Sequence, residues 1–451
     1  MISSCSSAAT RFTALHWLMI AAVAGTFFIV EHSLTMSTTS ESIESSDFVA
    51  AEVDSDVESG SAIRRVAFVG LGSVGSLVLL LSRRRLNLDH PLYALIAGLL
   101  LWTAFSVVWS ADAGLTIRRL VVVGLSVAAA IGWTRLFDPA QSVRALLLIA
   151  AGYLALGVVC EIGLRTFRPW SGLYRFSGTT HPNTQGILCG LLAIGAVARA
   201  AVPGRRLAWI AAAVVALGFL YLTKSRTTLG ATVVTIAGLL WLRLSWAGRA
   251  VTFVGGLTLA STALAASLLL RPGGDSAAEV LLMGRTEEIG TLTGRLPLWT
   301  ELRNDIAARP LAGYGYGAFW SPPTLYRVAQ NQGWQIPHAH SGYFETTLNL
   351  GLIGLALVLA IGGVMLVTAW RRDDPPRLET GFTVGLVLFA AIYSLADAGF
   401  ALPSFASFAL LLTAMQTPAM RRSRPVVATG PAATKPQPAS RPASTPATAA
   451  T

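Results

Sequence analysis

Residues 348–369 read LNLGLIGLALVLAIGGVMLVTA, a stretch of apolar and small side chains without one charged group. Such a stretch is typical of a helix that crosses a lipid bilayer, which uses about 20 mostly apolar residues. The whole chain has this character, because 53% of its 451 residues are hydrophobic and only 13% are charged. Ordinary soluble domains carry about 25% charged residues. The sequence therefore predicts an all-α polytopic membrane protein and excludes a soluble fold.

Apolar stretches bounded by charges predict about twelve transmembrane helices, near residues 14–30, 66–81, 91–109, 120–134, 145–163, 185–201, 207–222, 227–243, 250–270, 348–369, 380–396 and 402–418. The first is expected to be retained, because no small-residue cleavage site follows it. Residues 1–13 are expected to form the N-terminus and residues 14–270 to contain helices 1–9, with a disordered acidic loop at 31–65. A large, partly helical loop is expected at 271–347, helices 10–12 within 348–418, and a disordered tail at 419–451.

Arginines recur in every second connection, and cytoplasmic connections are enriched in cations. This alternation predicts both termini in the cytoplasm and residues 31–65 and 271–347 outside. The net charge of +11 does not indicate nucleic-acid binding, because the basic residues punctuate apolar stretches instead of gathering on one surface. The inner set consists of Arg83, Arg84, Arg85, Arg135, Arg144, Arg205, Arg206, Arg243, Arg249, Arg371, Arg372, Arg377, Arg421, Arg422 and Arg424.

Several motifs resemble known sites but are better explained by membrane structure. Gly70-Leu-Gly-Ser-Val-Gly75 fits a dinucleotide-binding pattern, yet it lies inside an apolar stretch, where small residues favour close helix packing. Gly313-Tyr-Gly-Tyr-Gly317 matches part of a potassium filter, and a tight turn at the membrane surface is expected instead. Trp299, Trp320 and Trp334 fit an interfacial aromatic belt. No Cys or His spacing typical of zinc occurs, so no metal site and no disulfide is expected.

A second group of cations lies on the predicted outer side, against the charge bias. Such cations need an acidic partner or an anionic ligand, and guanidinium groups match phosphate oxygens in a two-pronged contact. The sequence therefore predicts an outward-facing phosphate site, with contact to lipid head groups as the alternative for Arg165, Arg168 and Arg327. The group consists of Arg165, Arg168, Arg175, Lys224, Arg226, Arg285, Arg295, Arg303, Arg309 and Arg327.

Four segments carry the polar residues of this side: RFSGTTHPN at 175–183, TKSR at 223–226, GRLPLW at 294–299 and HAHSGYFE at 338–345. With these motifs in this order, the chain resembles the O-antigen ligase and polymerase superfamily from about residue 90 to 418. Within it, the chain looks most like the bacterial exopolysaccharide polymerases. The resemblance implies a GT-C-like membrane glycosyltransferase that acts at the periplasmic face of the bacterial inner membrane, without cofactor or metal, on glycans carried by undecaprenyl pyrophosphate.

The resemblance places the family's histidine at His340 and its two arginines at Arg226 and Arg295. Ser341 stands where the family usually has an asparagine, which leaves open what that amide does. The two guanidinium groups suit the charge of a leaving diphosphate, and a neutral imidazole suits a general base. The further candidates for substrate binding are Arg175, His181, Asn183, Lys224, Arg285, His338, Tyr343, Glu345 and Asp397.

Some of these candidates have a second interpretation. His181 and Asn183 either hold the glycan or cap the following helix. Glu345 lies one helical turn after His340 and is a candidate for orienting its imidazole. Asp397 is an acidic residue near a membrane boundary, where burial is costly.

Three functions are compatible with these residues. The first is a polymerase that joins lipid-linked oligosaccharide repeats into exopolysaccharide, with membrane lipids and polysaccharide export and chain-length proteins as candidate partners. The second is a ligase of the same superfamily, either an O-antigen ligase or a protein O-oligosaccharyltransferase. The third is a glycan transporter, which would be expected to have matched broken helices in two halves, and none is apparent in the sequence.

Overall fold

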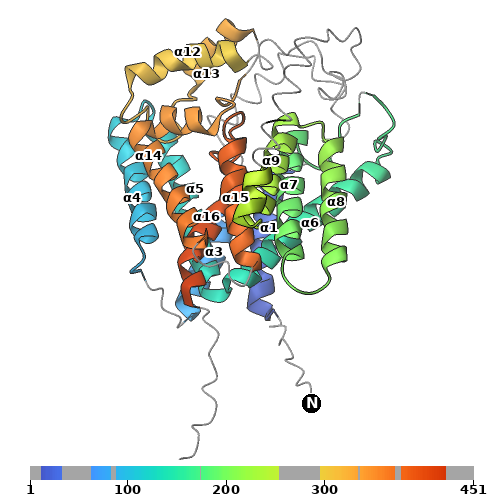
Figure 1. Ribbon diagram of the computed structural model, residues 1–451. Coiled ribbons are helices and arrows are strands. Elements are labelled where there is room, and N and C mark those ends of the chain that lie inside the picture. The colour runs from blue at the N-terminus through green and yellow to red at the C-terminus, as the bar shows by residue number, and fades with distance from the viewer. Residues whose placement is uncertain are drawn as a thin grey trace, which may run out of the picture.

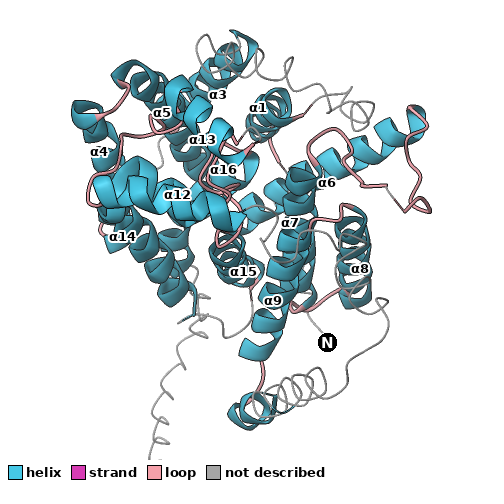
Figure 2. Cartoon of the chain, turned by 90° about the horizontal axis from the view of Figure 1, so that it is seen from above, coloured by secondary structure: helices cyan, strands magenta, loops and turns pink. Residues whose placement is uncertain are grey.

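The described part of the chain is helical, without a strand. The computed structural model describes residues 12–32, 62–82, 88–172, 174–252, 258, 295–333, 336–370 and 377–422. Most helices lie side by side, and α12 (Arg295–Ala308) and α13 (Pro322–Gln332) lie across one end of them, as Figures 1 and 2 show. The predicted all-α fold class is confirmed.

The helices fall on the apolar stretches of the sequence. They are α1 (Ala14–Glu31), α3 (Ala62–Leu81), α4 (Pro91–Phe105), α5 (Ala113–Leu136), α6 (Pro139–Gly163), α7 (Pro182–Ala200), α8 (Arg206–Leu222), α9 (Arg226–Leu242), α14 (Gly342–Trp370), α15 (Leu378–Tyr393) and α16 (Phe405–Gln416). Short 3₁₀ turns, η2 (Ser106–Trp109) and η4 (Thr417–Arg422), follow α4 and α16. The predicted span at 250–270 lies almost entirely outside the described residues.

Six of the described helices are long and apolar enough to cross a membrane: α1, α3, α4 with η2, α5, α6 and α14. Four further apolar helices are shorter, namely α8, α9, α15 and α16 with the start of η4. Helix α7 is buried along most of its surface and packs against α6, α8, α9 and α15. The chain is thus a multi-pass membrane protein, while the count of twelve crossings stays a prediction.

Several helices begin next to a residue whose side chain accepts a hydrogen bond from a backbone N–H group that has no partner within the helix. The Asp112 carboxylate accepts a hydrogen bond from Leu115 N at 2.8 Å at the start of α5. At the start of α6, Asp138 and Gln141 each accept a hydrogen bond from the other's backbone N–H, and Pro139 follows at the first helical position. These caps fix where the connections between helices begin.

The connections assigned to the outer side meet at the end of the bundle that α12 and α13 cover. Hydrogen bonds there join His32 to Thr179, Thr180 to Glu31, Ala111 to Tyr314, and Arg175 to Thr223. At the opposite end, others join Tyr93 to Met415 and Gln416 to Ser142. The bundle therefore has two distinct ends, and one of them gathers the polar motifs.

The glycine motif of residues 70–75 lies in α3 and serves helix packing, as predicted. A Cβ on Gly75 would overlap the backbone of Ala129 in α5, and one on Gly132 would overlap the backbone of Gly75. The two helices approach this closely because neither position carries a side chain.

Helix α14 is broken at Gly351, whose φ of 67° lies in the left-handed region. The loop before α13 bonds to both sides of the break: Tyr314 N donates to Leu348 O at 2.8 Å, and Leu352 N donates to Pro310 O at 2.8 Å. Backbone groups that a continuous helix would pair internally are thus satisfied by another segment, as apolar surroundings require. One broken helix was not apparent from the sequence, and the described residues contain no second break to match it.

The Gly-Tyr-Gly-Tyr-Gly segment is the turn that makes this pairing. Gly313, Gly315 and Gly317 all have positive φ, which glycine adopts without a steric penalty. The predicted turn is confirmed, and Tyr314 is half-buried in it. That side chain donates to Asp305 O at 3.0 Å and packs against Phe319 in the layer of α12 and α13.

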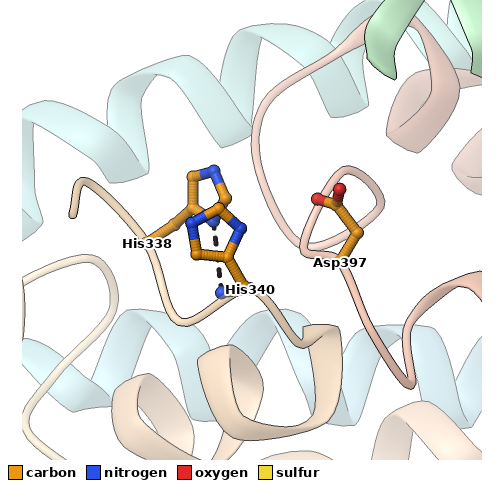
Figure 3. Close-up of side chains that lie close together, drawn as sticks. All are labelled: His338, His340 and Asp397. Carbon is orange, nitrogen blue, oxygen red and sulfur yellow. Dashed lines mark hydrogen bonds between the residues drawn. The ribbon is translucent and has the colours of Figure 1, made fainter. Parts of the chain in front are cut away.

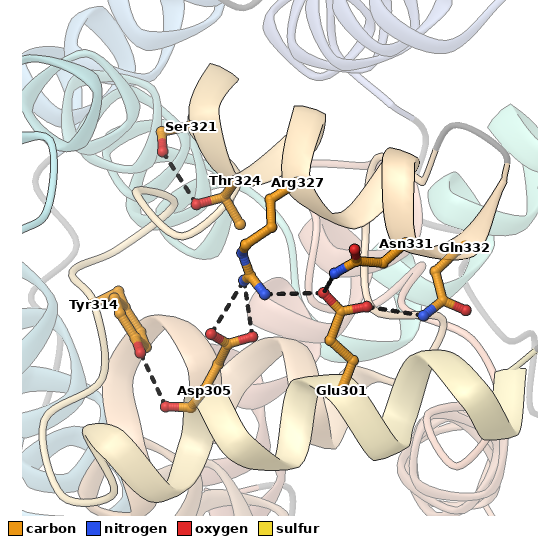
Figure 4. Close-up of polar contacts among 8 residues, drawn as sticks. All are labelled: Glu301, Asp305, Tyr314, Ser321, Thr324, Arg327, Asn331 and Gln332. Atoms are coloured by element: carbon orange, nitrogen blue, oxygen red, sulfur yellow. Dashed lines mark hydrogen bonds and ion pairs between the residues drawn. The ribbon is translucent and has the colours of Figure 1, made fainter.

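An ion-pair cluster fastens α13 to α12 (Figure 4). Arg327 contacts Glu301 at 2.9 Å and Asp305 at 3.0 Å, and the Asn331 and Gln332 amides also donate to Glu301. Arg327 therefore has two acidic partners in α12, as a cation on this side needs in the absence of an anionic ligand.

Candidate functional site

The segment His338–His340 forms a constrained turn directly before α14. His340 has a φ of 48°, a left-handed conformation that few non-glycine residues adopt. Its backbone N–H donates to His338 Nδ1 at 3.2 Å, and the two rings lie 4.2 Å apart between centroids (Figure 3). Strained backbone of this kind persists only where neighbours hold it, and it is concentrated at functional sites.

Ala339, between the two histidines, is fully buried and anchored on both sides. Its N–H donates to Glu345 at 3.0 Å, and its carbonyl accepts a hydrogen bond from Trp299 Nε1 at 2.9 Å. Trp320, which is 3% exposed, donates to the same carboxylate. The assignment to an interfacial belt is therefore wrong for the buried Trp320, while Trp299 is half-buried and Trp334 lies outside the described residues. Glu345 contacts the backbone beside His340 and not its imidazole.

Asp397 approaches the two histidines from the connection between α15 and α16 (Figure 3). One donor atom of each of the three side chains lies within 4.8 Å of the others. The Asp397 carboxylate also accepts from Ala398 N at 2.7 Å, and its backbone carbonyl accepts from Gly342 N at 3.0 Å. The buried carboxylate is thus fixed beside the start of α14.

Two histidines and one carboxylate form a donor set that divalent transition metals accept. The set has a cation beside it, however, because the Arg295 guanidinium interacts electrostatically with both His340 and Asp397. Positive neighbours disfavour a bound cation and favour an anion. The arrangement therefore suits an anionic ligand next to the histidines better than a metal ion among them.

A chain of polar contacts links Arg175 to Asp397. Arg175 donates to Thr223 O at 3.2 Å and to the Asn183 amide oxygen at 3.5 Å, and the Asn183 amide nitrogen donates to Asp397 at 3.5 Å. His181 is the N-cap of α7, with Nδ1 accepting from Asn183 N at 3.2 Å. The capping interpretation is thus confirmed for His181, while Asn183 extends toward the histidine turn.

Arg226 and Arg295 come together from two helix starts. Arg226 is the first residue of α9 and Arg295 the first of α12, and Arg295 Nη1 donates to Thr227 at 3.4 Å. Arg295 interacts electrostatically with Arg226, Asp397 and His340. Within the described residues, the Arg226 guanidinium has neither a hydrogen bond nor an ion pair, so its donors are available to a ligand.

Lys224 gives the turn between α8 and α9 its shape. It has a φ of 52°, and its Nζ donates to the carbonyl of Gly172. The side chain therefore lies against the 164–172 connection, while its backbone brings the chain into α9 at Arg226.

The environment of His340 lowers the pKa of its imidazole to about 3. Desolvation by burial is the largest cause, followed by the nearby His338, Arg295 and His181. Burial and positive neighbours both disfavour the charged imidazolium. His340 is thus neutral at physiological pH.

Of the twelve predicted residues, eight gather around the histidine turn, Glu345 contacts the turn through Ala339 N, and the other three are not placed there. Tyr343 donates to Ala391 O at 2.8 Å, which ties α14 to α15, Lys224 contacts Gly172, and Arg285 lies outside the described residues. Sequence reasoning missed Trp299, Trp320 and Asn349 as supports of the turn, although the first two are in segments that it singled out. The group around the turn is Arg175, His181, Asn183, Arg226, Arg295, His338, His340 and Asp397.

Residues 211–359 match the family model of the O-antigen ligase domain. The matched range contains α9, α12, α13 and the histidine turn, together with the break in α14. A comparison with curated proteins found no match.

Proposed function

Because residues 211–359 of this chain belong to the O-antigen ligase and polymerase superfamily, we propose that it is a membrane glycosyltransferase. It joins oligosaccharide repeats carried on undecaprenyl pyrophosphate into exopolysaccharide, at the periplasmic face of the bacterial inner membrane. Membrane lipids surround it, and polysaccharide export and chain-length proteins are its candidate partners.

The observation that carries this proposal is the convergence of guanidinium groups on a neutral imidazole. Arg295 lies near His340 at the start of α12, and Arg226 lies near Arg295 at the start of α9. Arg175 joins the same region through Asn183 and Asp397. Guanidinium groups match phosphate oxygens, and helix N-termini also favour anions. The donor diphosphate is accordingly assigned to Arg226 and Arg295, with Arg175 as a further contact.

In the proposed reaction, an acceptor hydroxyl oxygen attacks the anomeric carbon of the donor sugar. A new glycosidic bond forms as the bond between that carbon and the pyrophosphate oxygen breaks, and undecaprenyl pyrophosphate leaves with the bonding electron pair. His340 accepts the hydroxyl proton, and the arginines stabilise the negative charge of the leaving group. A single displacement of this kind inverts the anomeric centre.

Substrate binding is expected to raise the low pKa of the His340 imidazole. An imidazole with a pKa of about 3 is a poor base. A bound diphosphate offsets the charge of Arg295 and stabilises the imidazolium, so that the pKa rises when the donor is present. His340 is thus a stronger base in the donor complex than in the free protein.

The proposal includes no metal, because the arginines supply the charge that a divalent ion would otherwise supply. Transfer should therefore continue in EDTA.

The direct test is His340→Ala in a strain that lacks the chromosomal copy. The variant should insert normally, form no polymer, and leave lipid-linked repeats to accumulate. Polymer of normal length and amount from this variant would refute the role of His340 as the base.

Ligation of a finished glycan is the second candidate, and the description of the matched family as O-antigen ligase favours it. Glycans from a deletion strain separate the two activities. Loss of a polymerase leaves single repeats, whereas loss of a ligase leaves long chains on the carrier lipid.

A transporter is the third candidate. A transporter built on inverted repeats would have discontinuous helices in both halves. Purified protein in liposomes discriminates, because transport forms no new glycosidic bond.

A further inference from the structure

Glu345 is a buried acid at the centre of a hydrogen-bond network beside the histidine turn. Its side chain is 1% exposed. The carboxylate accepts hydrogen bonds from Trp320 Nε1 at 3.0 and 2.9 Å, from Ala339 N at 3.0 Å and from Asn349 Nδ2 at 2.9 Å. All three partners are donors, so the site matches a carboxylate that only accepts.

Each partner connects Glu345 to a different element. Ala339 belongs to the histidine turn, and Trp320 precedes α13. Asn349 lies two residues before the break in α14, and its amide oxygen accepts from Gly317 N at 3.0 Å. The carboxylate thus ties the turn to the broken helix and to the glycine loop that pairs with it.

A cation from α5 balances the buried charge. Arg119 interacts electrostatically with Glu345. A Cβ at position 317 would overlap its side chain, so the guanidinium lies against Gly317. Hydrogen-bond donors and a nearby guanidinium are what a buried acidic side chain needs to offset its loss of water.

The conformation of His340 depends on this anchor. The peptide groups on both sides of Ala339 are held, one by Glu345 and the other by Trp299. Together with the hydrogen bond from His340 N to His338 Nδ1, these two bonds hold the left-handed backbone of His340 against its intrinsic cost.

We propose that Glu345 is a positioning residue, which directs the His340 imidazole at the acceptor hydroxyl by fixing the peptide N–H of Ala339. This inference rests on the proposed function of His340 as the base. Glu345 contacts neither substrate and takes no proton during transfer.

The chain offers a matched control in Glu161, at the end of α6. Its side chain is also 1% exposed, and it accepts from Tyr174 OH at 2.5 Å, Ser177 N at 3.0 Å and Gly178 N at 2.7 Å. It fixes the segment that carries Arg175 and His181, on the donor-binding side. The same substitution at two equally buried carboxylates therefore tests two different parts of the site.

The experiment compares Glu345→Gln with Glu161→Gln, purified in detergent and normalised to protein that elutes as a single folded species. The substrate is the polyprenyl-pyrophosphate-linked repeat isolated from the deletion strain. In Glu345→Gln, the side-chain NH₂ group stands where a carboxylate oxygen accepted a hydrogen bond. Two donors then face each other, the bond is lost, and the histidine turn is no longer held. Its kcat should fall about a hundredfold, as small misplacements of catalytic groups do, while KM stays within about twofold.

Glu161→Gln should instead raise KM by about tenfold or more, because it loosens the segment that positions Arg175. Its kcat should change by a smaller factor than its KM. A wild-type kcat for Glu345→Gln, or the same change in KM for both variants, would overturn the proposal. Loss of folded protein alone would lower yield and not kcat.

If Glu345→Gln does not fold, Trp299→Phe tests the other anchor of Ala339. It removes one hydrogen bond and keeps the ring, so kcat should fall about tenfold at unchanged KM. An unchanged kcat contradicts the proposal. Full activity of His340→Ala would refute the proposed role of His340 as the base, whatever Glu345→Gln does, so the two failures are distinguishable.

Discussion

At the scale of single residues, His340 combines a strained backbone with an imidazole whose pKa is lowered to about 3. An ordinary histidine becomes protonated as the pH falls through about 6.5. His340 in the free protein stays neutral down to about pH 3, so kcat/KM should not fall through its protonation between pH 7 and 5.

The bound diphosphate raises this pKa, so any acidic decline in kcat should occur at higher pH than that in kcat/KM. The measurement is the pH dependence of both parameters, which report the complex and the free enzyme respectively. A tenfold loss of kcat/KM per pH unit below 6.5, attributable to His340, would contradict the assigned environment.

Arg226 provides a second prediction at this scale. Arg226→Lys keeps the charge but loses the planar fork, so kcat/KM should fall by about ten- to a hundredfold, equivalent to about 1.4–2.7 kcal/mol. Arg303→Lys is the control, because Arg303 bonds only to Thr300 among the described residues and lies on exposed surface. Equal activity of the two variants would argue against phosphate binding by Arg226.

At the scale of elements, the break in α14 links the glycine loop to the histidine turn. Gly351→Ala should destabilise the protein by about 2–6 kcal/mol, since a φ of 67° with a ψ of −173° is nearly restricted to glycine and costs other residues about 1–3 kcal/mol, and overpacking costs about 1–3 kcal/mol. The added Cβ would overlap the carbonyl group of Leu311.

Thermal unfolding in detergent checks this, with Gly363→Ala as the control in the same helix, because a Cβ there meets nothing within 4 Å. A melting temperature for Gly351→Ala equal to that of the control would show that the break does not require glycine.

The elements also show what sequence reasoning could predict and what it missed. Apolar stretches predicted the helices, since hydropathy directly reflects the apolar environment. The break at Gly351 was missed because a glycine in an apolar stretch is equally typical of helix packing. Glu345 was predicted to orient His340, but its bond to the Ala339 peptide was not. That bond and the anchoring by Trp299 and Trp320 were missed because side-chain bonds to a peptide group leave no periodic signal.

At the scale of the whole molecule, segments that are far apart in sequence meet at one end of the bundle. The alternation of arginine-rich connections predicted which connections share an end, and the hydrogen bonds join those connections. The exact contacts could not be predicted, because they depend on how α12 and α13 cover that end. From the order of the motifs, the sequence predicted that Arg175, Arg226, Arg295 and His340 belong to one phosphate-binding site. The geometry is compatible with that prediction.

The most direct measurement is an in vitro transfer assay with purified protein, the lipid-linked repeat and EDTA. Mass spectrometry follows glycan length, and chromatography follows free polyprenyl pyrophosphate. The account predicts that one polyprenyl pyrophosphate is released for each glycosidic bond formed, that EDTA does not stop the reaction, and that His340→Ala abolishes it. Transfer that stops in EDTA and resumes with a divalent cation would contradict the proposed charge stabilisation by Arg226 and Arg295.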